Sequence, residues 1–256
     1  MTDFILHTLR SSIGLWQTYA FFAGIAWLLG YVFFKRRWFH RKIIAHFPKS
    51  RHVWREIGYS AISVVIFSAV GMLTFVLIRH GWTRMYWHTT HYGLIWLFCS
   101  TALVILLHDA YFYWTHRLMH HPKLFPYFHR VHHLSHNPTP WSAYAFDPLE
   151  AFVQATIFPL ALVLIPMHPL AFGIFMIWQI TFNVLGHTGY EYTPHGFMDS
   201  WVKYILNTPT NHIMHHEKMR GNYGLYFGFW DRIMGTNHSD YESRFRSVTA
   251  KKEKLV

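Results

Sequence analysis

The sequence predicts an all-α integral membrane protein with about four transmembrane helices and a histidine-rich helical cap. Three observations predict this fold. Apolar residues make up 52% of the chain and charged residues only 14%, whereas about a quarter of the residues are charged in a typical soluble domain. The apolar residues gather in runs that are long enough to cross a bilayer. Tight clusters of histidine follow the third of these runs.

The first 110 residues are expected to form mainly a membrane anchor. Residues 13–34 and 57–78 carry no charged side chain, and about 20 apolar residues suffice for a helix to span the bilayer. Residues 93–107 form a third apolar run that leads directly into His108 and Asp109. These three runs predict three membrane-spanning helices.

Residues 151–186 are also apolar, but Pro159, Pro166 and Pro169 interrupt them. Proline lacks a backbone N–H and clashes with the preceding turn, so it ends or kinks a helix. We therefore expect two short membrane segments that meet near residues 166–169. Such a pair enters and leaves on the same side, which returns the rest of the chain to the side of the first histidine cluster.

The loop between the first two runs is strongly basic. Residues 35–55 contain eight Lys and Arg and no acid, and the positive-inside rule places such a loop in the cytoplasm. The third run then leads back to the cytoplasm, so the histidine-rich cap is expected on the cytosolic face. The basic residues of this loop supply much of the net charge of +11. Contact with anionic lipid headgroups explains much of the remaining positive charge. We therefore expect a membrane partner and no nucleic-acid partner.

Eight histidines lie in three clusters with helical spacing. Residues three and four apart share a helix face, so each cluster is expected to aim its imidazoles at one point. Neutral imidazole is a common ligand of iron, zinc and copper. Because a transition metal takes roughly four to six ligands, eight rings predict a cap with a di-metal site. The clusters are His116 and His120; His129, His132 and His133; and His212, His215 and His216.

An all-histidine ligand set narrows the choice of metal. Structural zinc usually brings cysteines, but the single Cys99 lies inside the third run. Hard ions prefer oxygen ligands, whereas imidazole with room for O2 suits iron or copper. The few acidic side chains near the clusters are suited to accept hydrogen bonds from the imidazoles and so fix their tautomers. We expect this role for Asp109, Glu191 and Asp231 among nearby acids that also include Asp147, Glu150 and Glu217.

The residues around the clusters are similar to those of a known family. The run from His108 to Glu150 reads HDAYFYWTHRLMHHPKLFPYFHRVHH…FDPLE, and the run from His212 to Thr236 reads HIMHHEKMRGNYGLYFGFWDRIMGT. Over roughly residues 95–240 the chain resembles the sterol desaturase and fatty acid hydroxylase superfamily of integral-membrane, non-haem di-metal oxidases. The resemblance implies a four-helix anchor, a cytosolic cap over the metals and O2-dependent oxidation of a lipid C–H bond.

The resemblance also implies a set of metal ligands, which comprises the eight clustered histidines. The family uses a further histidine between the second and third clusters, and His187 is the candidate. Fatty acid 2-hydroxylases place another histidine four residues later, where this chain has Glu191. Either the ligand set is smaller here or Glu191 takes that place. The chain also has Asp147 where many members have histidine.

The resulting hypothesis is an iron enzyme that hydroxylates or desaturates a lipid. Two iron ions, which zinc can replace in a purified sample, would react with O2 and oxidise a sterol, fatty acyl chain, sphingoid base or carotenoid. The clusters do not separate hydroxylation from desaturation, and we lean to hydroxylation. No G-x-G-x-x-G loop and no His-Pro-Gly-Gly segment occurs in the chain, so we expect a separate cytochrome b5 or ferredoxin-type electron donor with its reductase.

Two other functions and two locations stay open. A membrane metal-binding or transport protein, or a catalytically silent structural metal cage, would also carry histidine clusters. The final residues, Lys252 to Val256, resemble an endoplasmic-reticulum retrieval signal but also read as a plain basic tail. The bacterial inner membrane and the endoplasmic reticulum are therefore both compatible. We expect one domain over residues 1–256, with an anchor (1–110), a catalytic region (111–240) and a basic tail (241–256).

Overall fold

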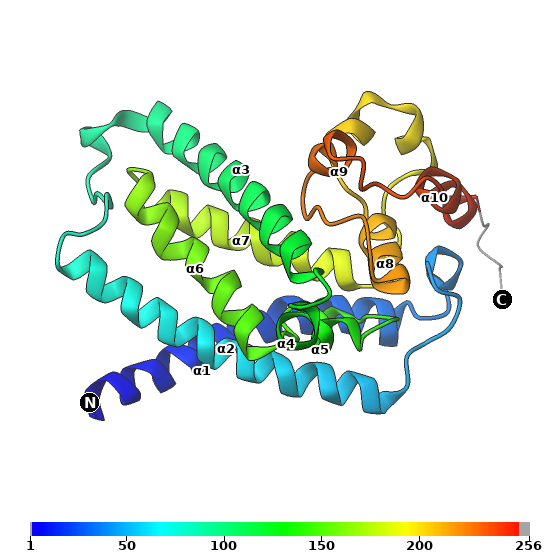
Figure 1. Ribbon diagram of the computed structural model, residues 1–256, viewed down its shortest axis with the longest axis horizontal. Helices are drawn as coiled ribbons and strands as arrows, with labels where there is room; N and C mark the ends of the chain where they lie inside the picture. The colour runs from blue at the N-terminus through cyan, green and yellow to red at the C-terminus, as the bar shows by residue number, and fades with distance from the viewer. Residues whose placement is uncertain (1, 251–256) are drawn as a thin grey trace.

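The computed structural model describes residues 2–250, and the regular elements in that range are helices apart from three isolated bridges. The all-α prediction is therefore confirmed. Five long helices form a bundle, and three shorter ones gather at the end opposite the N-terminus (Figure 1). The long helices are α1 (Thr2–Trp27), α2 (Ser50–Arg79), α3 (Gly93–Met119), α6 (Pro148–Leu164) and α7 (Pro169–His187). The shorter helices are α8 (Pro209–Lys218), α9 (Phe229–Ile233) and α10 (Tyr241–Thr249).

Single turns and irregular helices connect these elements. A π-helical stretch, Leu28–Phe33, extends α1. The 3-10 turns are Phe39–Arg41, Thr89–His91, Pro140–Ser142, His195–Asp199 and Trp201–Tyr204. The four-residue helices α4 (Phe125–Phe128) and α5 (Arg130–His133) follow α3; His132 and His133 lie on α5, and His129 lies between the two helices.

Four of the described helices are long and apolar enough to cross a membrane, as expected. They are Leu6–Phe33, Ser50–Arg79, Gly93–Met119 and Pro169–His187. Only 28% of the apolar stretch of α2 is buried inside the protein, and Ile95 on α3 is 82% exposed. Apolar surface on this scale is stable only against lipid. The chain is an integral membrane protein.

The proline-rich region differs in one detail from the expectation. Two helices do meet there, since α6 ends at Leu164 and α7 begins at Pro169. Pro159, however, lies inside α6 and does not end it. It removes one backbone hydrogen bond, but Ile157 and Leu162 on either side are fully buried, so packing holds the helix together across this position.

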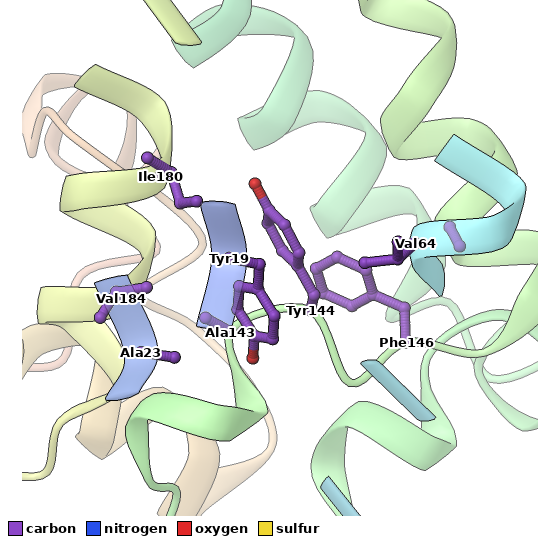
Figure 2. Close-up of a cluster of buried hydrophobic side chains, with 9 residues drawn as sticks. Tyr19, Ala23, Val64, Ala143, Tyr144, Phe146, Ile180 and Val184 are labelled. Atoms are coloured by element: carbon purple, nitrogen blue, oxygen red, sulfur yellow. The ribbon is translucent and has the colours of Figure 1, made fainter. Parts of the chain in front are cut away.

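The segment after the second histidine cluster lies in the centre of the bundle. The ring of Tyr144 stacks on Tyr19 of α1, with centroids 4.5 Å apart (Figure 2). The Tyr19 hydroxyl donates to the carbonyl of Trp141 at 2.7 Å, and Asn183 of α7 donates to the carbonyl of Ala143 at 3.0 Å. This segment is therefore fixed by helices from both sides.

The basic loop between α1 and α2 packs against the end of the bundle that carries the short helices. Ile43 donates its backbone N–H to the carbonyl of Gly189 at 3.0 Å. Its side chain packs with Ile213 of α8 and Val248 of α10. The loop and the histidine clusters thus lie at the same end of the molecule.

Part of the expected basic tail is folded. Residues 241–249 form α10, whose Tyr241 and Phe245 are buried against Phe197 and Met214. The tail is therefore shorter than expected, because these side chains supply apolar surface for the cap. Residues 251–256, including the lysines of the retrieval-like sequence, lie outside the described residues.

Candidate metal centre

The structure brings all nine expected histidines together in two adjacent groups, with ring nitrogens within 4.8 Å of one another inside each group. The rings of His133 and His216, which belong to different groups, have centroids only 4.9 Å apart. Group 1 comprises His116, His120, His129, His133 and His215, and group 2 comprises His132, His187, His212 and His216.

The clusters are divided between the groups in a way that the sequence did not predict. We expected each cluster to aim at one point, and this is wrong for the second and third clusters. His129 and His133 lie in group 1, but His132 lies in group 2. In the third cluster the division is reversed, with only His215 in group 1. The reason is geometric, because side chains at i+3 and i+4 on a helix point about 100° apart.

The spacing of the ring nitrogens fits metal coordination. The Nε2 atoms of His120, His133 and His215 lie 3.0 to 3.2 Å from one another. In group 2 the Nε2 of His212 lies 2.9 Å from that of His187 and 3.1 Å from that of His216. Metal–nitrogen bonds of about 2.0–2.1 Å place neighbouring ligands about 2.9–3.4 Å apart. Where neither ring of such a pair carries a proton on Nε2, the two lone pairs face each other and repel unless a cation lies among them.

Hydrogen bonds to backbone carbonyls fix several of these rings. The Nδ1 of His116 lies 2.9 Å from the carbonyl oxygen of Tyr223, that of His187 lies 2.7 Å from Asn183, and that of His215 lies 2.6 Å from Gly221. A carbonyl can only accept, so Nδ1 carries the proton. The lone pair of Nε2 is then free to bind a metal.

Burial keeps the rings in the neutral form that binds metal. It lowers the pKa of His120 to about 4 and that of His132 and His212 well below the ordinary value for histidine. Neighbouring imidazoles add to this effect for His132 and His212. The donor set therefore fits a transition metal, and neither group contains a carboxylate.

A loop after α8 supplies two of the carbonyls that orient group 1. Asp231 holds this loop, because its carboxylate accepts the backbone N–H of Tyr223 and of Gly224, each at 2.8 Å, and the hydroxyl of Thr236 at 2.7 Å. Gly221 is required in the loop: its φ is +64°, and an added Cβ would lie 2.8 Å from the carbonyl oxygen of Thr236. Residues 222–224 (NYG) and 230–236 (WDRIMGT) thus help to position His116 and His215.

The three carboxylates expected to hold imidazoles bind backbone groups instead. Asp231 acts through the loop just described. Asp109 accepts the backbone N–H of Tyr226 at 3.0 Å. Glu191 accepts the backbone N–H and hydroxyl of Thr210 at the start of α8 and also bonds to Thr193. Glu191 lies outside both histidine groups, since these bonds occupy its oxygens.

The acid that does contact a clustered histidine is Glu150. Its Oε1 lies 2.7 Å from the Nδ1 of His129, and both side chains are buried. The sequence does carry a signal for this contact, because Glu150 lies in the first turn of a very apolar helix. An acid that is buried there requires a partner. Asp147 has a related role, because it accepts the backbone N–H of Val131 at 2.8 Å and holds the start of α5.

Other histidines lie outside the two groups. His108 is buried, and its Nδ1 lies 2.9 Å from the hydroxyl of Tyr226, which is a hydrogen bond inside the bundle. His121 and His136 are exposed. They provide natural controls for the clustered histidines.

A narrow pocket lies on the membrane side of both groups. The Phe112 ring lies 5.0 Å from that of His116, and the Phe146 ring lies 5.1 Å from that of His132. Both phenylalanines line the pocket, which has a volume of about 20 Å³. An apolar group in this pocket would therefore lie next to both histidine groups.

A wider groove between α1, α2, α6 and α7 lies next to the pocket. Phe67, Tyr144 and Phe158 line both spaces, and the groove has a volume of about 570 Å³. Trp178 and Phe182 stack on each other and line neither space. Trp114 is 45% exposed.

Comparison with known proteins identifies the family. The sequence model of the fatty acid hydroxylase family matches residues 101–236, which is more than half of the chain. The chain belongs to the fatty acid hydroxylase family. The resemblance inferred from the histidine clusters is therefore confirmed. No solved structure matches this family member.

Several curated relatives of this fatty acid hydroxylase family member are sterol desaturases. A Delta(7)-sterol 5(6)-desaturase of Gibberella zeae is 31% identical over 223 residues, which cover 86% of this chain and 66% of the relative. One from Aspergillus fumigatus is 28% identical over 253 residues, covering 90% and 74%. Lathosterol oxidase of Rattus norvegicus is 30% identical over 190 residues, covering 72% and 60%. The matches thus span 60 to 74% of the length of these relatives.

Proposed function

We propose that the chain is a metal-dependent membrane oxidase that desaturates or hydroxylates a lipid. One observation carries this proposal: nine histidines form two groups beside a pocket that shares aromatic walls with an apolar groove among the membrane helices. A transporter would place its ligands near the bilayer midplane. Here His116 and His120 lie at the C-terminal end of α3 and His187 at that of α7, so the groups are expected near a surface of the membrane.

A sterol is the proposed substrate. The relatives act on Delta(7)-sterols or on lathosterol by name, which favours desaturation, whereas the histidine clusters did not separate desaturation from hydroxylation. The groove of about 570 Å³ falls within the range of roughly 300–1,000 Å³ typical of ligand pockets. The substrate would enter it sideways from the bilayer.

Two iron ions are the proposed cofactors. Group 1 would hold one and group 2 the other, and with O2 they would supply the oxidising power for a C–H bond. The protein contributes orientation through the Nδ1 hydrogen bonds and the contact between His129 and Glu150. The aromatic walls at Phe112 and Phe146 exclude water and hold a carbon near both groups.

The proposed electron donor is a separate cytochrome b5 or ferredoxin. It would approach from the cytosolic face, where the positive-inside rule places the basic loop and therefore the histidine end of the molecule. Such donors are acidic, so their charge complements that of the loop.

Metal analysis tests the centre. We expect about two irons per purified chain, because roughly four to six ligands serve each ion. His215→Ala removes a group 1 ligand and His132→Ala a group 2 ligand, so each should lower the iron content. His121→Ala, at an exposed position, should not. Zinc that resists chelation in all forms would instead support a structural cage.

Product analysis tests the reaction. The protein in nanodiscs, supplied with lathosterol, O2 and a cytochrome b5 reducing system, should form a product with one additional double bond. The double variant with His132→Ala and His215→Ala should form none. A hydroxylated product would assign the chain as a hydroxylase, and metal content without any oxidised sterol would contradict the proposed substrate.

A further inference from the structure

Three amide side chains line the pocket beside the histidine groups. Gln154 of α6 and Gln179 and Asn183 of α7 face a space whose other walls are largely aromatic. Polar side chains are costly within the membrane and mark functional positions there. Their hydrogen bonds therefore indicate what the pocket is built to bind.

Two of the amides have partners. Gln179 donates to the hydroxyl of Tyr144 at 2.8 Å, and Asn183 donates to the carbonyl of Ala143 at 3.0 Å. Gln154 differs, because its Nε2 is buried and has no hydrogen-bond partner among the described residues. The residue is only 7% exposed. A buried N–H without an acceptor costs about 1–3 kcal/mol, so a ligand that supplies an acceptor would be stabilised.

Tyr144 provides a second donor in the same pocket. Its oxygen accepts from Gln179, so its own proton is available to a ligand. Figure 2 shows the stacked Tyr19 and Tyr144 rings with their hydroxyl groups at opposite ends. The Tyr19 hydroxyl turns to the backbone of Trp141, whereas Tyr144 lines the pocket.

These donors lie close to the histidine groups. Gln154 follows Glu150, the partner of His129, by one helical turn, and Asn183 precedes His187 by one turn. One turn advances about 5.4 Å along the helix. The pocket volume of about 20 Å³ is room for roughly one water-sized group. The pocket therefore suits a single oxygen atom near the reaction centre.

We propose that Gln154 and Tyr144 bind the hydroxyl oxygen of the lipid substrate and thereby set which carbon faces the metals. The inference rests on the proposed function and deepens it. A sterol carries its hydroxyl on carbon 3, two bonds from carbon 5. With that oxygen held in the pocket, the rings would lie beside Phe67 and Phe158, which line both the pocket and the groove, and the tail would lie in the groove.

Paired ligands test this subsite without activity. The purified protein in nanodiscs binds a fluorescent sterol, which is displaced by lathosterol or by its 3-deoxy analogue, cholest-7-ene. The hydroxylated lipid should bind about tenfold more tightly, as expected for two hydrogen bonds. Gln154→Leu and Tyr144→Phe should each reduce this ratio about threefold or more, mainly by weakening lathosterol binding.

Tyr111→Phe is the matched control. Its hydroxyl is also hydrogen-bonded between helices, to the carbonyl of Val153 and to Thr156, but it lies outside the pocket lining. It should leave the ratio unchanged. An affinity ratio near one in the wild type, or a ratio that Gln154→Leu and Tyr144→Phe do not alter, would overturn the inference. The amide side chains would then be assigned to binding water.

A second ligand pair separates this inference from the proposed substrate. If neither sterol binds, the sterol proposal fails, and octadecanol is compared with octadecane in the same variants, with displacement of a fluorescent fatty alcohol. A preference for the alcohol that depends on Gln154 and Tyr144 would support the hydroxyl subsite for a linear lipid. Loss of that dependence with this pair as well would overturn the subsite.

Discussion

At the scale of single residues, Glu150 is the carboxylate in direct contact with a candidate ligand. We predict that Glu150→Gln weakens iron binding about 10- to 100-fold, the range usual for partners of metal-bound histidine. The cause is a weaker contact with the Nδ1 of His129, because an amide accepts a proton less strongly than a carboxyl group does. Iron retained against a graded chelator measures the effect.

Glu217→Gln is the control for this prediction. Glu217 pairs with Arg244 at the surface and contacts neither histidine group. Equal iron retention in the two variants would contradict the role given to Glu150.

Lys42 offers a prediction about pH. The side chain is fully buried, its ammonium lies 5.1 Å from the Tyr190 ring centroid, and burial lowers its pKa to about 7. Between pH 7 and the ordinary value of 10.5, the unfolded state binds the proton and the folded state does not. Stability should therefore rise with pH there, by about 1.4 kcal/mol per unit.

Lys42→Met should remove this rise. The apparent melting temperature in detergent, measured from pH 7 to 10, checks it. Lys218→Met, at a partly exposed ion pair with Asp240, should keep the wild-type slope. A slope that persists in Lys42→Met would mean that another group carries the pH dependence.

At the scale of elements, the loop after α8 connects the family motif to the metal ligands. Gly221→Ala and Gly235→Ala form a matched pair, since φ is +64° at one and +65° at the other. Only Gly221 is crowded, and an added Cβ at Gly235 meets nothing within 4 Å. We predict a loss of about 1 kcal/mol for Gly235→Ala and a larger loss for Gly221→Ala.

Iron content separates the two glycine variants further. Gly221 supplies the carbonyl that accepts from His215, so Gly221→Ala should also lose iron from group 1. Gly235→Ala should keep it. Equal melting temperatures and equal iron in the two variants would show that the crowding is relieved by movement of the loop.

The elements themselves were largely predictable, because long apolar runs and helical histidine spacing are local properties of the sequence. The pairing of histidines was not. Whether His132 lies in the same group as His129 or as His212 depends on how α5 and α8 face each other. The spacing of histidines along the sequence does not contain this information. Gln154 was missed for the same reason, since its importance comes from an absent partner across the bundle.

At the scale of the whole molecule, the basic loop and α8, which carries the third histidine cluster, lie at one end and the loop between α2 and α3 lies at the other (Figure 1). Single cysteines in a Cys99→Ser background test this arrangement. An impermeant maleimide should label His46→Cys and His121→Cys from one side of sealed vesicles, the cytosolic side. His88→Cys should react only from the other side.

All three positions are exposed in the structure, so access to the reagent depends on the side of the membrane. Labelling of His46→Cys and His88→Cys from the same side would contradict a spanning α2. The sequence predicted this orientation through the charge of residues 35–55, which is a property of the chain alone. It could not predict that Ile43 would pack on Ile213 and tie the loop to the cap.

The second and third histidine clusters are each divided between the two groups, and this has a consequence for biosynthesis. Group 1 lacks His215, and group 2 lacks two of its four members, until α8 has been made and has docked. All four candidate membrane-spanning helices of the described residues precede α8 in the chain. A nascent chain therefore inserts and packs its bundle while both centres are still incomplete, and one late docking event closes them together.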